Sequence, residues 1–413
     1  MGNTHADREI LRPLAERYSA IAQQDIQKKR MERYYRTIGL EEVRPVVLID
    51  EVPWGEIRDD ALVSRCESEQ YRRLEGMLRC ALYQWEHFQV DKVIAPVFQI
   101  PKHIHSTGIG IEVQETRIKG DTGAYIESHE YVDQLQTDQD LERLELPVIT
   151  YDREGTERAA ELAADVFSGL METEIVGHVF QYNIWDRISC YRGVEKLLLD
   201  LAIRPDFMHR TARRFADIAA ATFTQYVELG LLHTNPLLLH CTPACARELP
   251  AGDFSGTPRP QDAWGRCSAQ IFSAVSPEMH DEFDLEYNQE VFGSCGLLYY
   301  GCCEPLDTKI DILRKRFTNL RKVSITPWAD PEIAAQSMGG DFVMAAKPNP
   351  AFVANPTFEP EPVQQEIHRC LDACRRHGTT CEFVLKDVST IANRPENLTR
   401  WSQTVAGVID QYF

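Results

Sequence analysis

The chain has 413 residues, of which 43% are hydrophobic and 26% charged, so it can build a large globular core and has no disordered or fibrous signature. Its formal net charge of −19 at pH 7, from 63 acidic against 44 basic residues, argues against a nucleic-acid partner, because a polyanion would meet a repulsive field. There is no apolar run of roughly 18 residues and no secretion signal at the start, so we expect no membrane partner and a cytoplasmic protein.

The first residues predict a helical extension. From about Asp7 to Arg36 the apolar positions recur at helical spacing among Ala, Gln, Lys, Arg and Glu. After this segment, short apolar β-branched runs alternate with longer amphipathic segments, which is typical of repeated βα units and a parallel sheet. We therefore expect a helical extension over residues 1–43 and an α/β domain over residues 44–413.

Eight apolar runs have the length and composition of buried strands. They are Val46–Ile49, Val93–Phe98, Ile175–Phe180, Leu237–His240, Leu297–Tyr300, Val323–Thr326, Phe342–Ala345 and Phe383–Leu385. Eight parallel strands predict a closed (β/α)₈ TIM barrel, and an open doubly wound sheet is the alternative. Ser276-Pro277-Glu278 and Asp330-Pro331-Glu332 each place a capping side chain before a proline, which predicts two helix starts.

An insertion over about residues 101–146 separates the second and third runs. Alternating residues at 111–114 and 124–127 flank the turn sequence Gly120-Asp121-Thr122-Gly123, which predicts a β-hairpin near the barrel mouth. Residues 248–262, rich in Pro and Gly, predict a second long loop.

Polar residues follow these runs, at the strand ends where a barrel of this kind collects its chemistry. Glu304, Asp387 and Lys347 are the candidate catalytic residues, and Lys386 precedes Asp387. The candidate metal ligands are Cys302, Cys303, Cys241 and His240, because thiolate and imidazole are the ligands that Zn²⁺ prefers. The candidate substrate contacts are Trp54, Tyr182, Asn183, Tyr300 and Trp328, whose aromatic members suit an aryl ether or a methylammonium group.

The remaining cysteines are expected to be reduced core residues, since unpaired Cys packs as a small hydrophobe. Cys370 and Cys374 lie four apart on a helix predicted over residues 364–376 and are assigned to packing. The same assignment covers Cys66, Cys80, Cys190, Cys267, Cys295 and Cys381.

Three features together resemble the uroporphyrinogen decarboxylase superfamily, over nearly the whole chain from Arg44 to Phe413. They are the segment Ser276 to Phe283, the strand that ends in Cys302, and Arg394-Pro395-Glu396-Asn397 after the last strand. The resemblance implies a (β/α)₈ barrel. It also implies one of two chemistries: metal-free decarboxylation of a porphyrinogen, or zinc-dependent methyl transfer to or from a corrinoid protein or a thiol.

The methyltransferase branch fits better than the decarboxylase branch. Decarboxylases of this family carry an arginine-rich segment after the first strand, where this chain has the acidic and apolar Leu48 to Trp54. The zinc enzymes carry a His-x-Cys pair and a distal Cys. Here Cys302 matches, but Tyr300 stands in place of the His and Val388 near the place of the distal Cys.

The leading hypothesis is a methyltransferase that moves a methyl group between a small methylated compound and a corrinoid protein or thiol, with Zn²⁺ as cofactor. One alternative is a carboxy-lyase that acts on a small carboxylic acid through Lys347, Lys386 and Asp387. Another is a ligand-binding homologue without catalysis. The methyl donor and acceptor, the direction of the reaction and the oligomeric state are not readable from the sequence.

Overall fold

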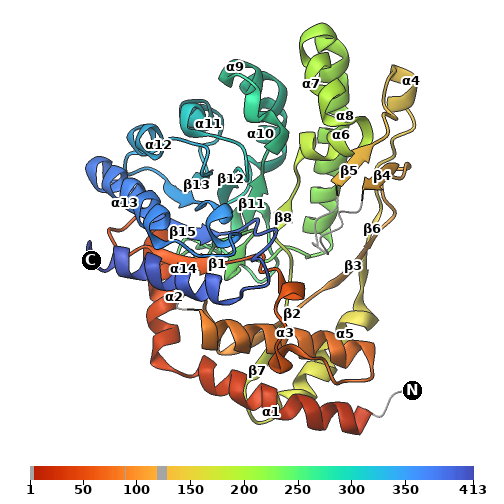
Figure 1. Cartoon of the computed structure of the whole chain (residues 1–413). Helices are drawn as coiled ribbons and strands as arrows, with labels where there is room; N and C mark the ends of the chain where they lie inside the picture. Colours follow the sequence, from red (N-terminus) through yellow and green to blue (C-terminus); the bar gives the residue numbers. More distant parts are fainter. Residues whose placement is uncertain (1–3, 89, 119–127) are drawn as a thin grey trace.

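The centre of the protein is a parallel sheet of seven strands, in the order β1-β15-β14-β13-β12-β11-β8 (Figure 1). The computed structural model describes residues 4–88, 90–118 and 128–413. The strands of this sheet are β1 (Val46–Ile49), β8 (Phe180–Gln181), β11 (Trp264–Cys267), β12 (Leu297–Tyr300), β13 (Leu320–Ile325), β14 (Val343–Ala346) and β15 (Cys381–Leu385). In the described parts of the chain no ladder joins the edge strands β1 and β8, so the fold is TIM-barrel-like and a closed barrel of eight strands is not shown.

Helices cover the outer face of this sheet (Figure 1). On β12, Leu298 and Tyr300 pack into the core beneath the helices, whereas Leu297 and Tyr299 point to the inner face, as the two-residue period of a strand requires. The helices along strands β11 to β15 are α9 (Pro277–His280), α10 (Glu286–Phe292), α11 (Ile310–Arg316), α12 (Pro331–Met338), α13 (Pro360–His377) and α14 (Glu396–Ile409).

The two predicted helix starts are confirmed. Ser276 Oγ accepts from the Met279 N–H at the start of α9, and Asp330 Oδ1 accepts from the Glu332 N–H at the start of α12. Cys370 and Cys374 are buried on α13, beside the Met344 sulfur of β14, so their assignment to packing is also confirmed.

A short hairpin crosses the inner face of the sheet. Its strands, β9 (Leu238–Leu239) and β10 (Thr242–Pro243), pair antiparallel with each other, so the prediction of a sheet strand over Leu237–His240 is wrong. Inward side chains of the sheet hold the hairpin: Trp264 Nε1 donates to the Ala244 carbonyl at 2.8 Å, and Lys322 Nζ donates to the Pro243 carbonyl at 2.7 Å. The turn of the hairpin carries His240 and Cys241.

A second lobe packs against the barrel-like part (Figure 1). Strand β2 (Val97–Pro101) pairs in parallel with β7 (Glu172–Val176), and a separate core forms beneath three helices. The prediction that the run at 93–98 belongs to the main sheet is therefore wrong, and the run at 175–180 spans the end of β7 and the start of β8. The helices of this lobe are α1 (Thr4–Ala22), α3 (Glu69–His87) and α5 (Arg153–Val166).

The predicted insertion forms two antiparallel pairs. Strand β3 (His103–Ser106) pairs with β6 (Ile149–Asp152), and β4 (Glu115–Ile118) pairs with β5 (Ser128–Tyr131). The predicted turn at 120–123 and strand at 124–127 lie outside the described residues. The remaining helices are α2 (Asp25–Ile38), α4 (Asp138–Leu141), α6 (Ile184–Arg192), α7 (Val194–Ile203) and α8 (Pro205–Glu228). Over the described ranges, no helix combines the length and apolar character needed to cross a bilayer.

Candidate functional site

Thiols, acids, an imidazole and a lysine meet at the carboxyl ends of the strands. Cys302 follows β12, Lys386 follows β15, and His240 comes from the turn of the inner hairpin. Cys302 Sγ lies 3.5 Å from His240 Nε2 and 3.6 Å from Cys303 Sγ. Cys241 Sγ lies 3.7 Å from the same His240 nitrogen. Residues far apart in the sequence therefore form one cluster, in which two strand ends and the turn of the inner hairpin meet.

The ammonium group of Lys386 contacts both paired cysteines. Its Nζ lies 3.2 Å from Cys302 Sγ and 3.1 Å from Cys303 Sγ, and it forms an ion pair with Asp387 at 2.7 Å. Asp387 Oδ2 in turn accepts from Cys303 Sγ at 3.2 Å. The ammonium is thus placed between two sulfurs and a carboxylate, an arrangement that favours one thiolate in the pair.

The two thiols have opposite acidities. The hydrogen bond from Cys303 lowers the pKa of Cys302 to about 3, against the opposing effect of burial and with further help from His240 and Lys386. The same hydrogen bond raises the pKa of Cys303, which keeps its proton. Burial opposes the charge on Lys386, but the neighbouring sulfurs outweigh it and raise the pKa of its ammonium. At neutral pH the pair therefore holds a Cys302 thiolate beside a Cys303 thiol.

Three residues of the site have a left-handed backbone. Glu51, Cys241 and Asp387 have φ values of 52°, 53° and 55°. Such a backbone is uncommon outside glycine and concentrates at functional sites, where the surrounding structure holds it. All three residues carry a group that can bind a metal or a proton.

Glu51, His240 and Cys241 form a group that can bind a metal. One ligand atom from each lies within 4.8 Å of the other two. Three protein ligands of oxygen, nitrogen and sulfur type, with one position left open, suit a catalytic zinc. The distances from His240 Nε2 to the Cys241 and Cys302 sulfurs, 3.7 and 3.5 Å, are close to the roughly 3.6 Å expected between N and S ligands of one tetrahedral zinc. The donor set fits zinc, and Glu51 is a candidate ligand that the sequence prediction omitted.

Glu304 holds the backbone of the loop that carries Cys302 and Cys303. Its fully buried carboxylate accepts from the Cys302 N–H at 2.9 Å and from the Ala269 N–H at 3.1 Å. Burial raises its pKa to about 7, although the backbone hydrogen bonds favour the charged form. Glu304 therefore positions Cys302 and can hold a proton near neutral pH.

This carboxyl group predicts a pH dependence of stability. Because the folded pKa, about 7, lies above the ordinary 4.5, the folded state holds an extra proton between these values. The free energy of unfolding is therefore expected to fall by about 3 kcal/mol as pH rises from about 4.5 through 7, and Glu304→Gln should remove that part of the slope. Urea unfolding between pH 4.5 and 8 measures this, with the exposed Glu278→Gln as the control. An unchanged slope in Glu304→Gln would contradict the assignment.

Lys347 has a structural partner. Its buried Nζ donates to the Cys241 carbonyl at 2.6 Å. This hydrogen bond holds the backbone of the hairpin turn that carries His240 and Cys241, and the predicted catalytic role of Lys347 stays a prediction. Lys347 acts on the site by positioning these two side chains.

Two of the predicted substrate residues face away from the thiols. The Tyr300 hydroxyl lies 2.6 Å from His280 Nε2 and donates to Asp284 Oδ2 at 2.6 Å, in the buried layer between β12 and the helices. Tyr182 is buried in the same outer core, with the Arg187 guanidinium 4.8 Å above its ring. The prediction that Tyr300 and Tyr182 contact substrate beside the thiols is wrong, because the side chain of Tyr300 on β12 and that of Tyr182, which follows β8, both lie in the outer core.

The other predicted substrate residues lie around the rim. Trp54 lines a cleft of about 500 Å³ together with Glu51 and Asp50, between the barrel-like part and the second lobe. Trp328, 72% exposed, follows β13. Asn183, directly after β8, accepts from Arg266 Nη1 at 3.2 Å. Their contact with a substrate stays a prediction.

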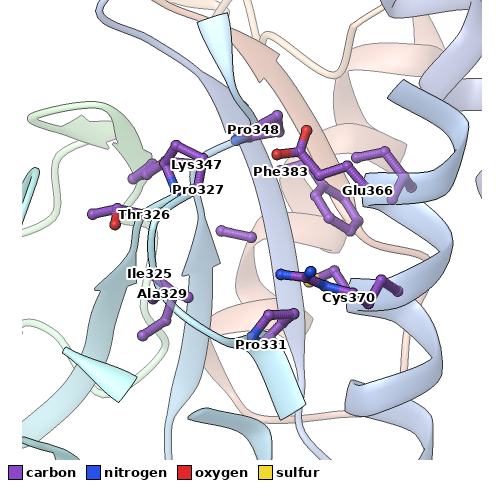
Figure 2. A pocket seen from close by; sticks show the side chains of 13 residues that line it. Ile325, Thr326, Pro327, Ala329, Pro331, Lys347, Pro348, Glu366, Cys370 and Phe383 are labelled. Atoms are coloured by element: carbon purple, nitrogen blue, oxygen red, sulfur yellow. The ribbon is translucent and has the colours of Figure 1, made fainter. Parts of the chain in front are cut away.

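A small cavity lies between the main sheet and α13 (Figure 2). Its volume is about 40 Å³, and it is lined by Thr326, Lys347 and Glu366, among others. Burial raises the pKa of Glu366 to about 7, and both its oxygens accept from the Asn349 N–H. Because this cavity lies between the strand ends and α13, it is separate from the thiol cluster and has room for water only.

The fold and the rim of polar strand ends define an α/β protein with a parallel, TIM-barrel-like sheet. A particular solved structure shares this fold: a methyltransferase from Methanosarcina mazei, with a TM-score of 0.50 and 11% identity, over 93% of this chain and 98% of that one. At such low identity the likeness shows the fold alone. No family model matches the chain, and no curated protein matches it in sequence.

Proposed function

We propose that the chain is a methyltransferase that moves a methyl group between a small methylated compound and a corrinoid protein or a thiol. The observation that carries the proposal is the cluster at the strand ends, where the Cys302 thiolate lies between His240 and Lys386. The fold, shared with a methyltransferase, supports the same reaction class.

The residues of the cluster have separate tasks in this proposal. A methyl carbon bound to O, N or S is a poor electrophile, so the leaving heteroatom needs stabilisation as its charge grows. Cys303 lies 3.6 Å from Cys302 Sγ and 3.2 Å from Asp387 Oδ2, so its single proton is shared between these two groups and stabilises the Cys302 thiolate. Lys386 offsets the negative charge of Cys302 and Asp387, and Glu304 holds the Cys302 backbone in place.

Zinc is the cofactor that this donor set suits. Glu51, His240 and Cys241 would hold it, with Cys302 next to the shared His240 nitrogen. A bound zinc would supply a Lewis acid for the leaving heteroatom, or would activate a thiol acceptor as its thiolate. The predicted ligands Cys302 and Cys303 lie 3.2 and 3.1 Å from Lys386 Nζ.

Zinc content tests the ligand set. Purified wild-type protein is expected to hold about one zinc per chain, and Cys241→Ser or His240→Ala should lower its affinity by about 100-fold or more, because each removes one of three ligands. Elemental analysis after dialysis against a graded chelator series measures this. The matched control is Cys190→Ser on α6, where the thiol lies 3.3 Å from the Asp186 carbonyl. Wild-type zinc content in both ligand variants would contradict the assignment.

The reaction itself is tested with isotope. Methyl-labelled ethers, amines and thioethers are incubated with a reduced, unmethylated corrinoid or with a thiol as acceptor, and a methyl-labelled corrinoid is incubated with a thiol to test the second transfer. Release of CO₂ from carboxylic acids without methyl transfer would instead favour the carboxy-lyase. That alternative is weakened by Lys347, whose ammonium is bound to a backbone carbonyl. A melting shift with ligands but no turnover would favour a binding protein.

A further inference from the structure

Arg266 is a buried arginine with an unused hydrogen-bonding edge. Its side chain is 3% exposed, and Nη1 donates to Asn183 Oδ1 at 3.2 Å. Neither Nε nor Nη2 has an acceptor within the described residues. These two nitrogens form the side-on edge of the guanidinium, which presents two parallel N–H groups. A buried charged group with two empty donors is costly, so this edge calls for an acceptor.

The surrounding carboxylates do not fill this edge. Glu304 uses its oxygens on the Ala269 and Cys302 N–H groups. Asp186 accepts from Ser268, Gln270 and the Ile271 N–H. Both acids contribute negative charge near Arg266, but their oxygens accept hydrogen bonds from other donors. Neither of these two carboxylates therefore occupies the Nε and Nη2 edge of Arg266.

The edge lies on the inner face of the sheet, near the thiols. Arg266 stands in register between Tyr299 of β12 and Gln181 of β8. Tyr299 is buried on the inner face, whereas Gln181, on the edge strand, is exposed. Register partners on neighbouring parallel strands point to the same face, so the buried Arg266 lies on the inner face between a buried and an exposed side chain. Glu304 joins the ends of the two strands, since it accepts from the Ala269 N–H after β11 and from the Cys302 N–H after β12, so Arg266 and Cys302 belong to neighbouring strands of the same rim.

We propose that the Nε and Nη2 edge of Arg266 binds a carboxylate of the substrate, so that the methyl donor or acceptor handled at Cys302 is a carboxylic acid. Two parallel donors match the two oxygens of a carboxylate, and this bidentate pairing gives orientation as well as affinity. Asn183 holds the other side of the guanidinium and fixes its plane. The inference rests on the proposed function for the methyl group, but the binding step can be tested without it.

Binding of matched acids and amides tests the proposal. Two probe pairs are used: 4-methoxybenzoate against 4-methoxybenzamide, and N,N-dimethylglycine against its carboxamide. Wild-type protein is expected to bind the acid of at least one pair about 10 to 100 times more tightly than the amide, as measured by calorimetry. Arg266→Lys keeps the charge but loses the fork and should remove most of this preference. Arg266→Met should remove all of it, with amide binding unchanged.

Two further variants keep the test decisive if Arg266→Met does not fold. Asn183→Asp should lower acid binding about tenfold, because a carboxylate on Nη1 neutralises the guanidinium without removing it. Arg187→Lys, outside the inner face, is the control and should bind both probes as wild type does. The proposal is overturned if wild type does not distinguish acid from amide, or if the preference survives in Arg266→Lys and Asn183→Asp.

The binding and transfer readouts separate the two proposals. Acid binding that depends on Arg266 without any methyl transfer would support the carboxylate site and overturn the methyltransferase. Methyl transfer from neutral compounds at wild-type rates in Arg266→Lys would do the reverse.

Discussion

Cys302→Ser is expected to lower the rate of methyl transfer by at least about 10³-fold. The serine hydroxyl is not ionised near neutral pH, so the variant loses the thiolate that Cys303, His240 and Lys386 stabilise. Initial rates with a labelled donor measure this loss. Cys190→Ser, a thiol away from the cluster, should keep the wild-type rate.

The pH dependence of alkylation checks the cause of that loss. Because its pKa is lowered to about 3, Cys302 is expected to be a thiolate at every pH above about 5, so its iodoacetamide rate should stay flat from pH 5 to 8. Cys303→Ala removes the largest stabilising hydrogen bond and should move the titration of Cys302 upward into that range. An alkylation rate that rises tenfold per pH unit through pH 8 in wild type would contradict a stabilised thiolate.

Lys322→Met is expected to destabilise the fold by about 3–5 kcal/mol. Lys322 and Glu382 are both fully buried on the inner face of the sheet, with Nζ and Oε2 2.8 Å apart. Thr242 of the inner hairpin contacts Glu382 and accepts from Lys322 at 2.8 Å. Removing the lysine leaves a buried carboxylate without its counter-ion and releases the hairpin. Thermal and urea unfolding midpoints measure the change.

The double variant Lys322→Met/Glu382→Leu is the control for this effect. It removes both charges at once, so it should recover most of the stability lost in the single variant. The hairpin would still lose three hydrogen bonds, two from Lys322 and one to Glu382, so zinc affinity at His240 should remain below the wild-type value. A single variant within about 1 kcal/mol of wild type would show that the pair does not hold the hairpin.

Six of the eight predicted strand runs contribute to the main sheet, because fully buried parallel strands are short apolar runs. The run at 93–98 has the same composition, but it ends at a strand of the second lobe, and local composition does not identify the pairing partner. Strand β11 was missed since Trp264-Gly265-Arg266-Cys267 has a glycine and an arginine in place of an apolar run. Gly265 is required there, as a Cβ would lie 2.8 Å from the Phe292 ring.

The meeting of Cys302, Cys303, Lys386 and Asp387 could be predicted because they follow β12 and β15, whose ends meet at one rim. His240 and Cys241 join them from the turn of the inner hairpin, although the strand predicted there does not belong to the sheet. Glu51 also follows a predicted strand, but its place beside His240 as a ligand could not be predicted, and neither could the role of Arg266. Glu51 reaches His240 through a left-handed backbone, and Arg266 belongs to the strand that the pattern did not reveal. The orientation of Tyr300 depends on its phase relative to Cys302, and Gly301, with φ of 100°, changes that phase.

Because the inner hairpin is not part of the main sheet, the donor side chains that it carries can change without a change in the sheet. On a strand, a shift of the register by one residue turns every side chain to the opposite face, so only a shift by two residues keeps the same face toward the site. His240 and Cys241 stand on a turn outside this alternation. A change in the length of the connection between α8 and β11 would therefore present a different donor to the same rim, while every strand of the sheet keeps its neighbours. Variation in the donor residues at this rim is expected to concentrate in that connection.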